Sequence, residues 1–164
     1  MNKREDPFEK MEIGIDFEYP PKMPMPEDLA RHREDFLKMR DENDTVKQVY
    51  AVAGLALYNA QCFEVGVQLA ILTTKRARRH VVNLGEYNAL EDELTVKTLG
   101  VLLREVRKVV EVNDRADSML NLALEKRNSL VHGFFEVHSM DMITAKGKLR
   151  MLDDLLERVR LFRM

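Results

Sequence analysis

The sequence predicts an all-α protein, an antiparallel bundle of four to five helices that follows an extended N-terminal arm. Apolar residues recur at three- and four-residue spacing through most of the chain, and no strand-like alternation continues beyond the arm. All five prolines lie within residues 1–26. A length of 164 residues with 45% hydrophobic residues is typical of one domain with one sizeable core. We therefore divide the chain into an arm, 1–26, and a helical domain, 27–164.

The arm combines prolines with acidic side chains, which disfavours a packed helix. Its prolines are Pro7, Pro20, Pro21, Pro24 and Pro26. Apolar residues alternate over Ile13, Ile15, Phe17 and Tyr19, a pattern that suits an extended segment lying against the body or a neighbouring subunit. The same composition also suits a disordered leader, and both interpretations stay open.

Five helices are expected after the arm, over residues 27–43, 45–80, 95–112, 114–137 and 141–162. The first is short and charged, and the second is long, with apolar residues at helical intervals from Val49 to Ala70. A polar loop is expected over 83–93, after which Thr95 is expected to cap the third helix. The third and fifth helices carry apolar stripes at Leu99, Leu102, Leu103, Val106 and Val110, and at Leu149, Leu152, Leu155, Leu156 and Val159.

Composition excludes several classes of protein. The 26 basic and 28 acidic side chains nearly balance, so the whole molecule has no strong field for nucleic acid or membrane. The charges are unevenly placed, because residues 1–44 hold 8 basic and 13 acidic side chains and the rest holds 18 and 15. Cys62 is the only cysteine, which excludes an intrachain disulfide and a zinc site made of cysteines.

A cytoplasmic protein without a membrane partner is expected. No apolar run follows the N-terminus as it would in a secretory signal. The apolar stretch 49–72 is long enough to span a bilayer, but Asn59, Gln61, Glu64 and Gln68 interrupt it. We interpret this stretch as a buried core helix.

The fourth helix carries the residues on which a functional argument depends. On a helical wheel its apolar residues form one stripe, made of Ala116, Met119, Leu120, Ala123, Leu130, Val131 and Phe134. Arg127 falls in the middle of that stripe. A guanidinium buried without a partner is costly, so its charge must be paired or the stripe must open onto a cleft.

A polar seam runs along the flank of this stripe. It consists of Asn121, Glu125, Asn128 and His132, which follow one another at four, three and four residues. His132 lies about 140° around the helix axis from Arg127 and about 7.5 Å along it. The two side chains can line one cleft from two sides but do not reach each other directly.

The second helix offers a counterpart for Arg127. Gln61, Glu64 and Gln68 share one face, and Glu64 is the only acidic residue between Asp44 and Glu86. A Glu64–Arg127 pair would satisfy both charges. Arg127 is then either a fastener between two helices or a group that binds a ligand.

Residues 123–135, Ala-Leu-Glu-Lys-Arg-Asn-Ser-Leu-Val-His-Gly-Phe-Phe, resemble the signature of HEPN domains, in which Arg, commonly followed by a polar residue such as Asn, precedes His by five positions. Arg127, Asn128 and His132 match it. The resemblance covers roughly residues 45–162. It implies a bundle that dimerises through two motif helices, forming a shared cleft, and in many members metal-independent cleavage of RNA.

The resemblance assigns roles that agree with the residue types. His132 would take the proton of the attacking 2′-hydroxyl, Arg127 would stabilise the phosphate, and Asn128 would orient either of them. A toxin paired with an antitoxin, or a phage-defence protein, is one expected setting. The antitoxin-regulated branch carries Tyr two residues after the His, and Phe134 stands there, so regulation by modification of that residue is not expected. A non-catalytic dimerisation or RNA-binding scaffold is the alternative.

The remaining signals have two interpretations each. Lys75, Arg76, Arg78 and Arg79 form the densest basic cluster, which either complements the C-terminus of the second helix or binds RNA phosphates. His132 and Glu136 stand four residues apart, but the paired Glu-x-x-His elements of a di-iron bundle are absent, so we expect neither a metal nor another cofactor. His32, His80 and His138 are expected at the surface.

Overall fold

The computed structural model describes residues 26–39, 41–78 and 83–163. Within these residues the chain forms helices and no strand, so the all-α prediction is confirmed. The elements are α1 (Pro26–Lys38), α2 (Glu42–Ala77), α3 (Leu84–Thr95), α4 (Leu99–Val109), α5 (Asp114–His132), α6 (Phe134–Val137), the 3-10 turn η1 (Asp141–Ile143) and α7 (Ala145–Phe162). The predicted arm and the residues Arg79 and His80 lie outside the described residues, apart from Pro26.

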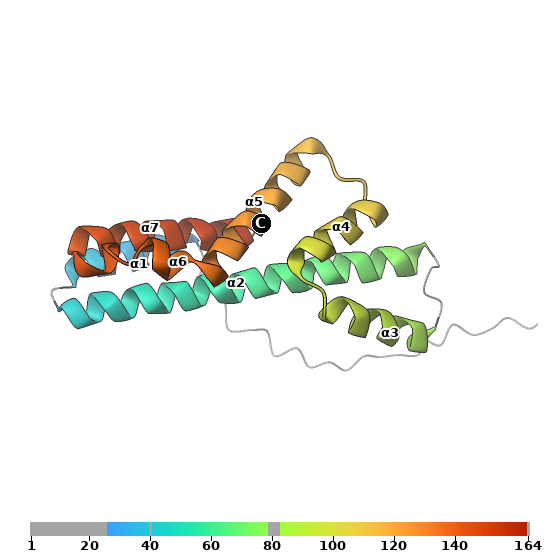
Figure 1. The fold of residues 1–164 in the computed structure, drawn as a ribbon, viewed down its shortest axis with the longest axis horizontal. Helices are drawn as coiled ribbons and strands as arrows, with labels where there is room; N and C mark the ends of the chain where they lie inside the picture. Colours follow the sequence, from blue (N-terminus) through green and yellow to red (C-terminus); the bar gives the residue numbers. More distant parts are fainter. Residues whose placement is uncertain (1–25, 40, 79–82, 164) are drawn as a thin grey trace, which may run out of the picture.

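Helix α2 organises the whole structure. Its 36 residues span about 54 Å. Helices α1, α6 and α7 lie along its first half, α3 and α4 lie along its second half, and α5 crosses between the two groups (Figure 1). Two groups of helices therefore share one long helix.

Each half of α2 has its own hydrophobic cluster. The α7 cluster joins α1, the first half of α2 and α7, with Val49, Ala56, Met151 and Leu155 among its fully buried members. The α4 cluster joins the second half of α2 with α3 and α4, and includes Ile71, Leu94, Leu99, Leu102 and Leu103. Phe63 packs against both. The sequence suggested one core, and the structure has two that meet at this side chain.

Helices α2 and α7 run in the same direction, which differs from the predicted antiparallel arrangement. Lys148 Nζ, near the start of α7, lies 3.1 Å from Glu42 Oε1 at the start of α2. Arg163 Nε, just past the end of α7, donates to Asn59 Oδ1 at 3.3 Å. The parallel pairing arises because α5 returns along α2, so that α7 begins again near the start of α2 (Figure 1).

The residues predicted as the loop 83–93 form helix α3. Asn83 caps it by accepting a 2.9 Å hydrogen bond from the Glu86 backbone N–H. Leu90 and Leu94 are buried against the α4 cluster, and the polar residues that suggested a loop face solvent. The cap of the next helix is Thr98, and Thr95 is the last residue of α3.

The predicted helix 114–137 is interrupted at Gly133. This residue leaves the helical conformation with φ −152°, so α5 ends at His132 and α6 begins at Phe134. Elsewhere the first helix ends at Lys38 instead of residue 43, and α2 begins at Glu42 under an Asp41 cap.

Gly147, in the first turn of α7, has a packing role. A Cβ at this position would overlap the backbone of Asp141 in η1. Thr144 caps the same turn by accepting from the Gly147 N–H at 3.0 Å. Glycine at residue 147 thus allows η1 to lie directly against α7.

Among the described residues, α2 is the helix long and apolar enough to cross a membrane by length and composition, with a third of its apolar window buried. Core helices of soluble proteins pass the same test. The interpretation of 49–72 as a buried helix holds for one face of α2, because the opposite face is exposed and apolar.

Candidate functional site

Arg127 pairs with Glu64 across the α2–α5 contact, as the sequence predicted. Arg127 Nη2 lies 3.0 Å from Glu64 Oε1, and the two side chains are 23% and 19% exposed. The pair is thus shielded from solvent without being sealed off, and its attraction is stronger than that of a surface ion pair. Arg127 is neither in the core nor unpaired.

Asn128 is the second partner of Arg127. Its exposed side chain accepts a hydrogen bond from Arg127 Nη1 at 3.4 Å. Glu64 and Asn128 therefore hold the guanidinium from two sides while both side chains stay in reach of solvent. Gln61, one turn before Glu64, is exposed, and Gln68, one turn after it, donates to the Leu94 carbonyl at 3.4 Å.

The polar seam predicted on α5 divides in two. Asn121 belongs to the α4 side, because its side chain accepts from Arg107 Nη2 at 2.8 Å and donates to Asp117 at 3.0 Å. Glu125 is exposed between the two halves. Of the four residues, Asn128 is the one that contacts Arg127, and Asn121 is about 16 Å from His132 along the axis.

His132 is the last residue of α5 and is exposed. It stands five residues after Arg127, so the two side chains leave the helix in directions about 140° apart. The structure does not bring them together within one chain. Any chemistry that uses both requires a ligand between them or a second copy.

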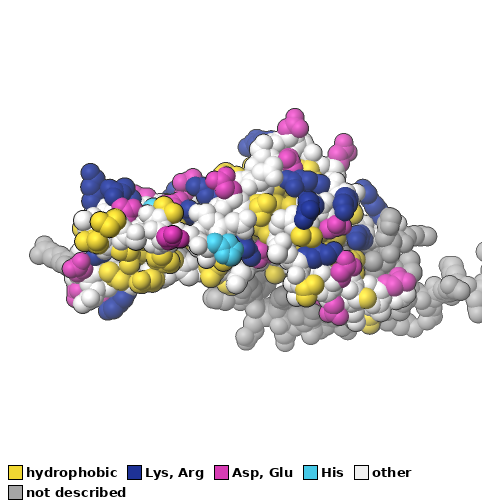
Figure 2. All heavy atoms as spheres, in the orientation of Figure 1, with side chains coloured by type: hydrophobic (Ala, Val, Ile, Leu, Met, Phe, Trp, Pro, Cys, Tyr) yellow, Lys and Arg dark blue, Asp and Glu magenta, His cyan; other side chains and the backbone are white. Residues whose placement is uncertain are grey.

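An exposed apolar surface borders the Arg127–Glu64 pair. The α2 apolar face consists of Tyr50, Leu57, Tyr58, Val65 and Leu69, which are 40% to 54% exposed. Phe135 of α6 extends it by packing on Tyr50 at a ring-centre distance of 5.2 Å, and Val131 of α5 is 44% exposed. Figure 2 shows hydrophobic side chains gathered toward the end of the molecule where α6 lies in Figure 1. A surface of this kind is typical of an interaction site.

A buried arginine fixes the C-terminal half of α5. Arg158 of α7 is 5% exposed and donates to the Lys126 carbonyl at 2.6 Å and to Ser129 Oγ at 3.3 Å. Its Nε and Nη2 hold the Asp154 carboxylate at 3.2 and 2.9 Å, and its guanidinium lies 5.3 Å from the centre of the Phe134 ring. The Arg158 guanidinium therefore ties to α7 the turn of α5 that carries Arg127 and Asn128.

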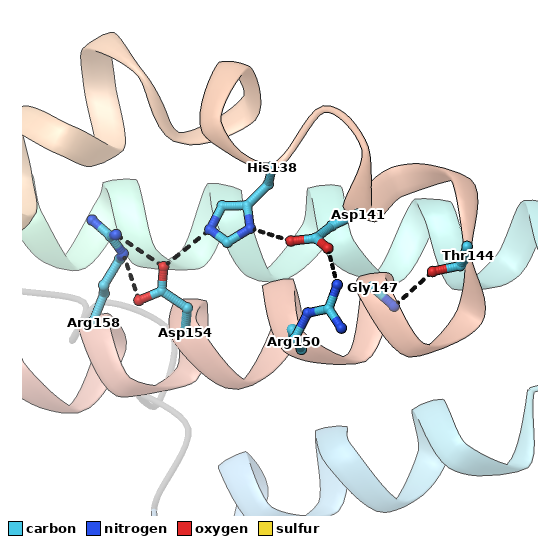
Figure 3. A network of polar contacts seen from close by, with 7 residues as sticks. All are labelled: His138, Asp141, Thr144, Gly147, Arg150, Asp154 and Arg158. Carbon is cyan, nitrogen blue, oxygen red and sulfur yellow. Dashed lines mark hydrogen bonds and ion pairs between the residues drawn. The ribbon is translucent and has the colours of Figure 1, made fainter.

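His138 belongs to the same network and is not a surface residue as predicted. Its Nδ1 lies 2.8 Å from Asp141 Oδ2 and its Nε2 lies 3.5 Å from Asp154 Oδ2, so the ring bridges η1 and α7 (Figure 3). Arg150 contacts the other Asp141 oxygen. The sequence interpretation missed His138 because this residue lies between two predicted helices, and no periodic pattern links it to its partners, which are three and sixteen residues away. His32 is half-buried beside Gln48, at 3.0 Å.

The network also sets the ionisation of its carboxyl groups. Hydrogen bonds from His138 and Arg150 hold the pKa of Asp141 below its ordinary value. Burial raises the pKa of Asp154, but the hydrogen bonds and charge of Arg158, with Lys126, outweigh burial and leave that pKa lowered. Both groups are stabilised as carboxylates.

The basic cluster at the end of α2 lies near acidic side chains of α3 and α4. Lys75 is half-buried, Arg76 and Arg78 are exposed, and Arg79 lies outside the described residues. The pKa of Glu93 is lowered mainly by Lys97 and further by Lys75. The pKa of Glu105 is lowered as well, mainly by Lys108. About 16 Å of helix lies between Glu64 and Lys75, so this cluster is separate from the Arg127 site.

No group of three or more His, Cys, Asp or Glu side chains in the described part of the chain is arranged to hold a metal ion. Glu136 and His132 are both exposed, on either side of the break at Gly133. Comparisons of the chain with protein-family models, with curated proteins and with solved structures find no match.

Proposed function

We propose that the protein is a HEPN-like, metal-independent endoribonuclease whose cleft forms between two copies of the chain. The observation that carries the proposal is the position of Arg127. It is held by Glu64 and Asn128 at the edge of the exposed α2 apolar face, with exposed His132 one and a half turns further along α5.

A second copy is favoured for a geometric reason. Arg127 and His132 of one chain leave α5 in directions about 140° apart, so they do not point at the same spot on the surface of one chain. Packing of two α2 apolar faces would bury Tyr50, Leu57 and Val65 and bring the edges of the two chains together. Arg127 of one copy and His132 of the other would then face one substrate.

The chemistry uses the neighbouring 2′-hydroxyl of RNA. The 2′-oxygen attacks the phosphorus as the proton of the 2′-hydroxyl passes to His132, the bond from phosphorus to the 5′-oxygen breaks, and the leaving 5′-oxygen takes a proton from water. Arg127 has five N–H donors, of which the contacts with Glu64 and Asn128 occupy two, so others can bind the phosphate as its charge grows. The products carry 2′,3′-cyclic phosphate and 5′-hydroxyl ends, and no metal is needed.

The second candidate function is a non-catalytic scaffold that dimerises or binds RNA. The Glu64–Arg127 pair favours it, because that pair satisfies both charges without a ligand. In this function Arg127 fastens α5 to α2. For either function we propose a cytoplasmic homodimer, with an antitoxin or defence protein as a further partner. Phe134 is buried at 2% exposure and offers no hydroxyl for such a partner to modify.

The test is RNA cleavage in the presence of EDTA, which silences contaminating metal-dependent nucleases. Wild-type protein should cleave and leave cyclic phosphate ends, and His132→Ala should lower the rate about a hundredfold or more. Arg127→Ala should have a similar effect, while Arg115→Ala, an exposed arginine on the same helix, should have none. A folded dimer that leaves a broad RNA panel intact would leave the scaffold as the function.

A further inference from the structure

A mainly apolar cavity of about 660 Å³ lies beneath the N-terminal half of α5, outside the site just described. Protein interiors rarely leave voids much larger than a water molecule, so a space of this size is not a packing defect. The cavity is open to solvent, because Cys62 and Gly66 of α2 are exposed in its wall. Its apolar walls come from α2, α4, α5 and α7 and include Phe63, Val67, Val106, Met119, Leu120 and Phe162.

The cavity exists because the N-terminal half of α5 stands away from the helices below it. Of the 19 residues of α5 only Ala123 and Leu130 are buried, and the apolar stripe that begins at Ala116 lines the cavity instead of a packed neighbour. Arg107 of α4 holds this half of α5 in place through Asp117, at 2.6 Å. Apolar side chains that entered the cavity would supply the dispersion contacts that its walls lack.

Residues 11–19 of the N-terminal arm have a pattern that suits such a space. Apolar residues alternate without interruption with acidic residues or glycine over these nine positions. Successive side chains of an extended chain point to opposite sides, so an extended segment 11–19 has one wholly apolar face and one acidic face. The apolar face consists of Met11, Ile13, Ile15, Phe17 and Tyr19, and the other face of Glu12, Gly14, Asp16 and Glu18.

Helix α1 places the attachment point of the arm beside the cavity. It runs antiparallel to α7, because Arg33 Nε lies 2.8 Å from Asp153 Oδ1, and Leu29, one turn earlier in α1, lines a second pocket together with Arg160, two turns later in α7. Pro26, where α1 begins, is therefore level with the last turn of α7. The residues at the end of α7 line the cavity.

The chain between Pro26 and the alternating segment is long enough to reach the cavity. It consists of residues 20–25, and its prolines favour an extended course of about 3 Å per residue, or about 20 Å in all. The cavity wall formed by α2 runs from Asn59 to Ala70, which is about 16 Å of helix. An extended segment 13–19 spans about 20 Å, so its length matches that of the wall.

From the attachment point, the length and the alternation, we infer that residues 11–19 pack into this cavity of their own chain with their apolar face inward. The acidic face then stays in solvent. The inference does not depend on RNA cleavage, because Arg127, Asn128 and His132 lie on the other half of α5 and do not line the cavity.

Cys62 is a natural reporter of this packing. It is the only cysteine of the chain, it lines the cavity, and the described residues leave it exposed. A packed arm should therefore slow its reaction with Ellman's reagent. Replacing two residues of the apolar face, Ile15→Ser with Phe17→Ser, should raise the rate at least fivefold in the full chain.

The alternation itself supplies the matched control for this experiment. Asp16→Ser with Glu18→Ser changes the opposite face of the same segment and should leave the reaction rate of Cys62 unchanged. Equal rates for wild type and the Ile15→Ser, Phe17→Ser protein would overturn the inference, as would an equal rise in both double variants. All four changes lie in the arm, outside the two hydrophobic clusters, so the helical domain stays folded in each protein.

Methyl NOEs identify the surface and the chain that the arm contacts. Ile13 and Ile15 should show NOEs to Val67 or Val106 of the cavity wall. Absence of these NOEs, or NOEs to Val65 of the α2 apolar face in their place, would overturn the inference. A sample refolded from a mixture of isoleucine-labelled and valine-labelled chains should lack the NOEs to the cavity. Their presence in that sample would show that the arm packs on a second copy, and would overturn packing within one chain.

Discussion

The two halves of α2 are held to their neighbours by different means. The α7 cluster is crossed by buried and half-buried charges, namely Arg158, Lys148, Asp154 and His138, each with a partner on another element or one turn away. The α4 cluster is apolar inside, and its charges pair at the surface or at its edge, as Lys108 does with Glu105.

The difference matters because α5 is shared between the two regions. Its C-terminal half, which carries Arg127 and Asn128, is hydrogen-bonded to Arg158, one of the charged residues of the α7 cluster. Its N-terminal half is joined to α4 by Arg107 and covers a cavity. One helix therefore has a fixed end, where the candidate site lies, and an end with space beneath it.

The largest expected effect on stability comes from removing Arg158, the buried arginine of the α7 cluster. Arg158→Ala leaves the Asp154 carboxylate and the Lys126 carbonyl without their donor, and should lower the free energy of unfolding by about 3–5 kcal/mol. Urea unfolding measures this. The matched control is Arg33→Ala, whose pair with Asp153 is about half exposed and should contribute far less to stability. Similar losses in both variants would contradict the distinction between the two kinds of ion pair.

A pair of core truncations separates the two regions. Leu155→Ala and Leu103→Ala each remove a fully buried side chain, and each should cost about 2–5 kcal/mol. Native-state hydrogen exchange should show faster exchange in α3 and α4 for Leu103→Ala, and in α1 and α7 for Leu155→Ala. Identical exchange patterns would show that the clusters open as one unit.

Glu64→Gln tests the pair at the candidate site. It removes the carboxylate that faces Arg127, and because both side chains are about a fifth exposed, we expect a loss of about 1–3 kcal/mol. The neighbouring Gln61→Ala, at an exposed position on the same face, should change stability by less. An unchanged denaturation midpoint for Glu64→Gln would show that the pair does not stabilise the fold.

The smallest expected effect is a dependence of stability on acid pH. Folded-state pKa values of Asp141 and Asp154 lie below the ordinary value of about 3.9, so their contribution is present above that value and is lost as pH falls through the folded pKa. Stability of wild-type protein should fall between pH 5 and pH 3 as measured in urea. The stability of Asp141→Asn should fall less over the same interval. An equal fall would show that Asp141 does not contribute to this pH dependence.

The periodicity of apolar residues predicted the helices with long apolar stripes. It missed a short helix in which polar residues outnumber the buried apolar ones. Helix α3 has a solvent-facing side of Asn, Glu and Asp, so it resembled a loop, although Asn83 followed by Glu86 is a recognisable helix start. Glu64 was found as the partner of Arg127 because it is the only acid in its stretch of sequence. The approach of η1 to α7 comes from packing between segments and leaves no spacing pattern.

Arg158 could have been found by the reasoning that singled out Arg127. It stands between Leu155 and Phe162 in a core-facing stripe, with Asp154 one turn before it. The sequence therefore contained two arginines in apolar stripes. The structure separates them: Arg158 is 5% exposed with four partners, and Arg127 is within reach of solvent. Only the second can bind a ligand without rearrangement.

The central claim is that Arg127 and His132 act together from two copies of the chain. Mixing Arg127→Ala and His132→Ala proteins tests it most directly, after exchange of subunits has been confirmed by mass spectrometry of the mixed dimer. Such a dimer keeps one Arg127 and one His132 on opposite chains, so RNA cleavage in EDTA should rise well above the sum of the two separate variants. Mixed dimers that form and stay as inactive as either variant alone would contradict the shared cleft.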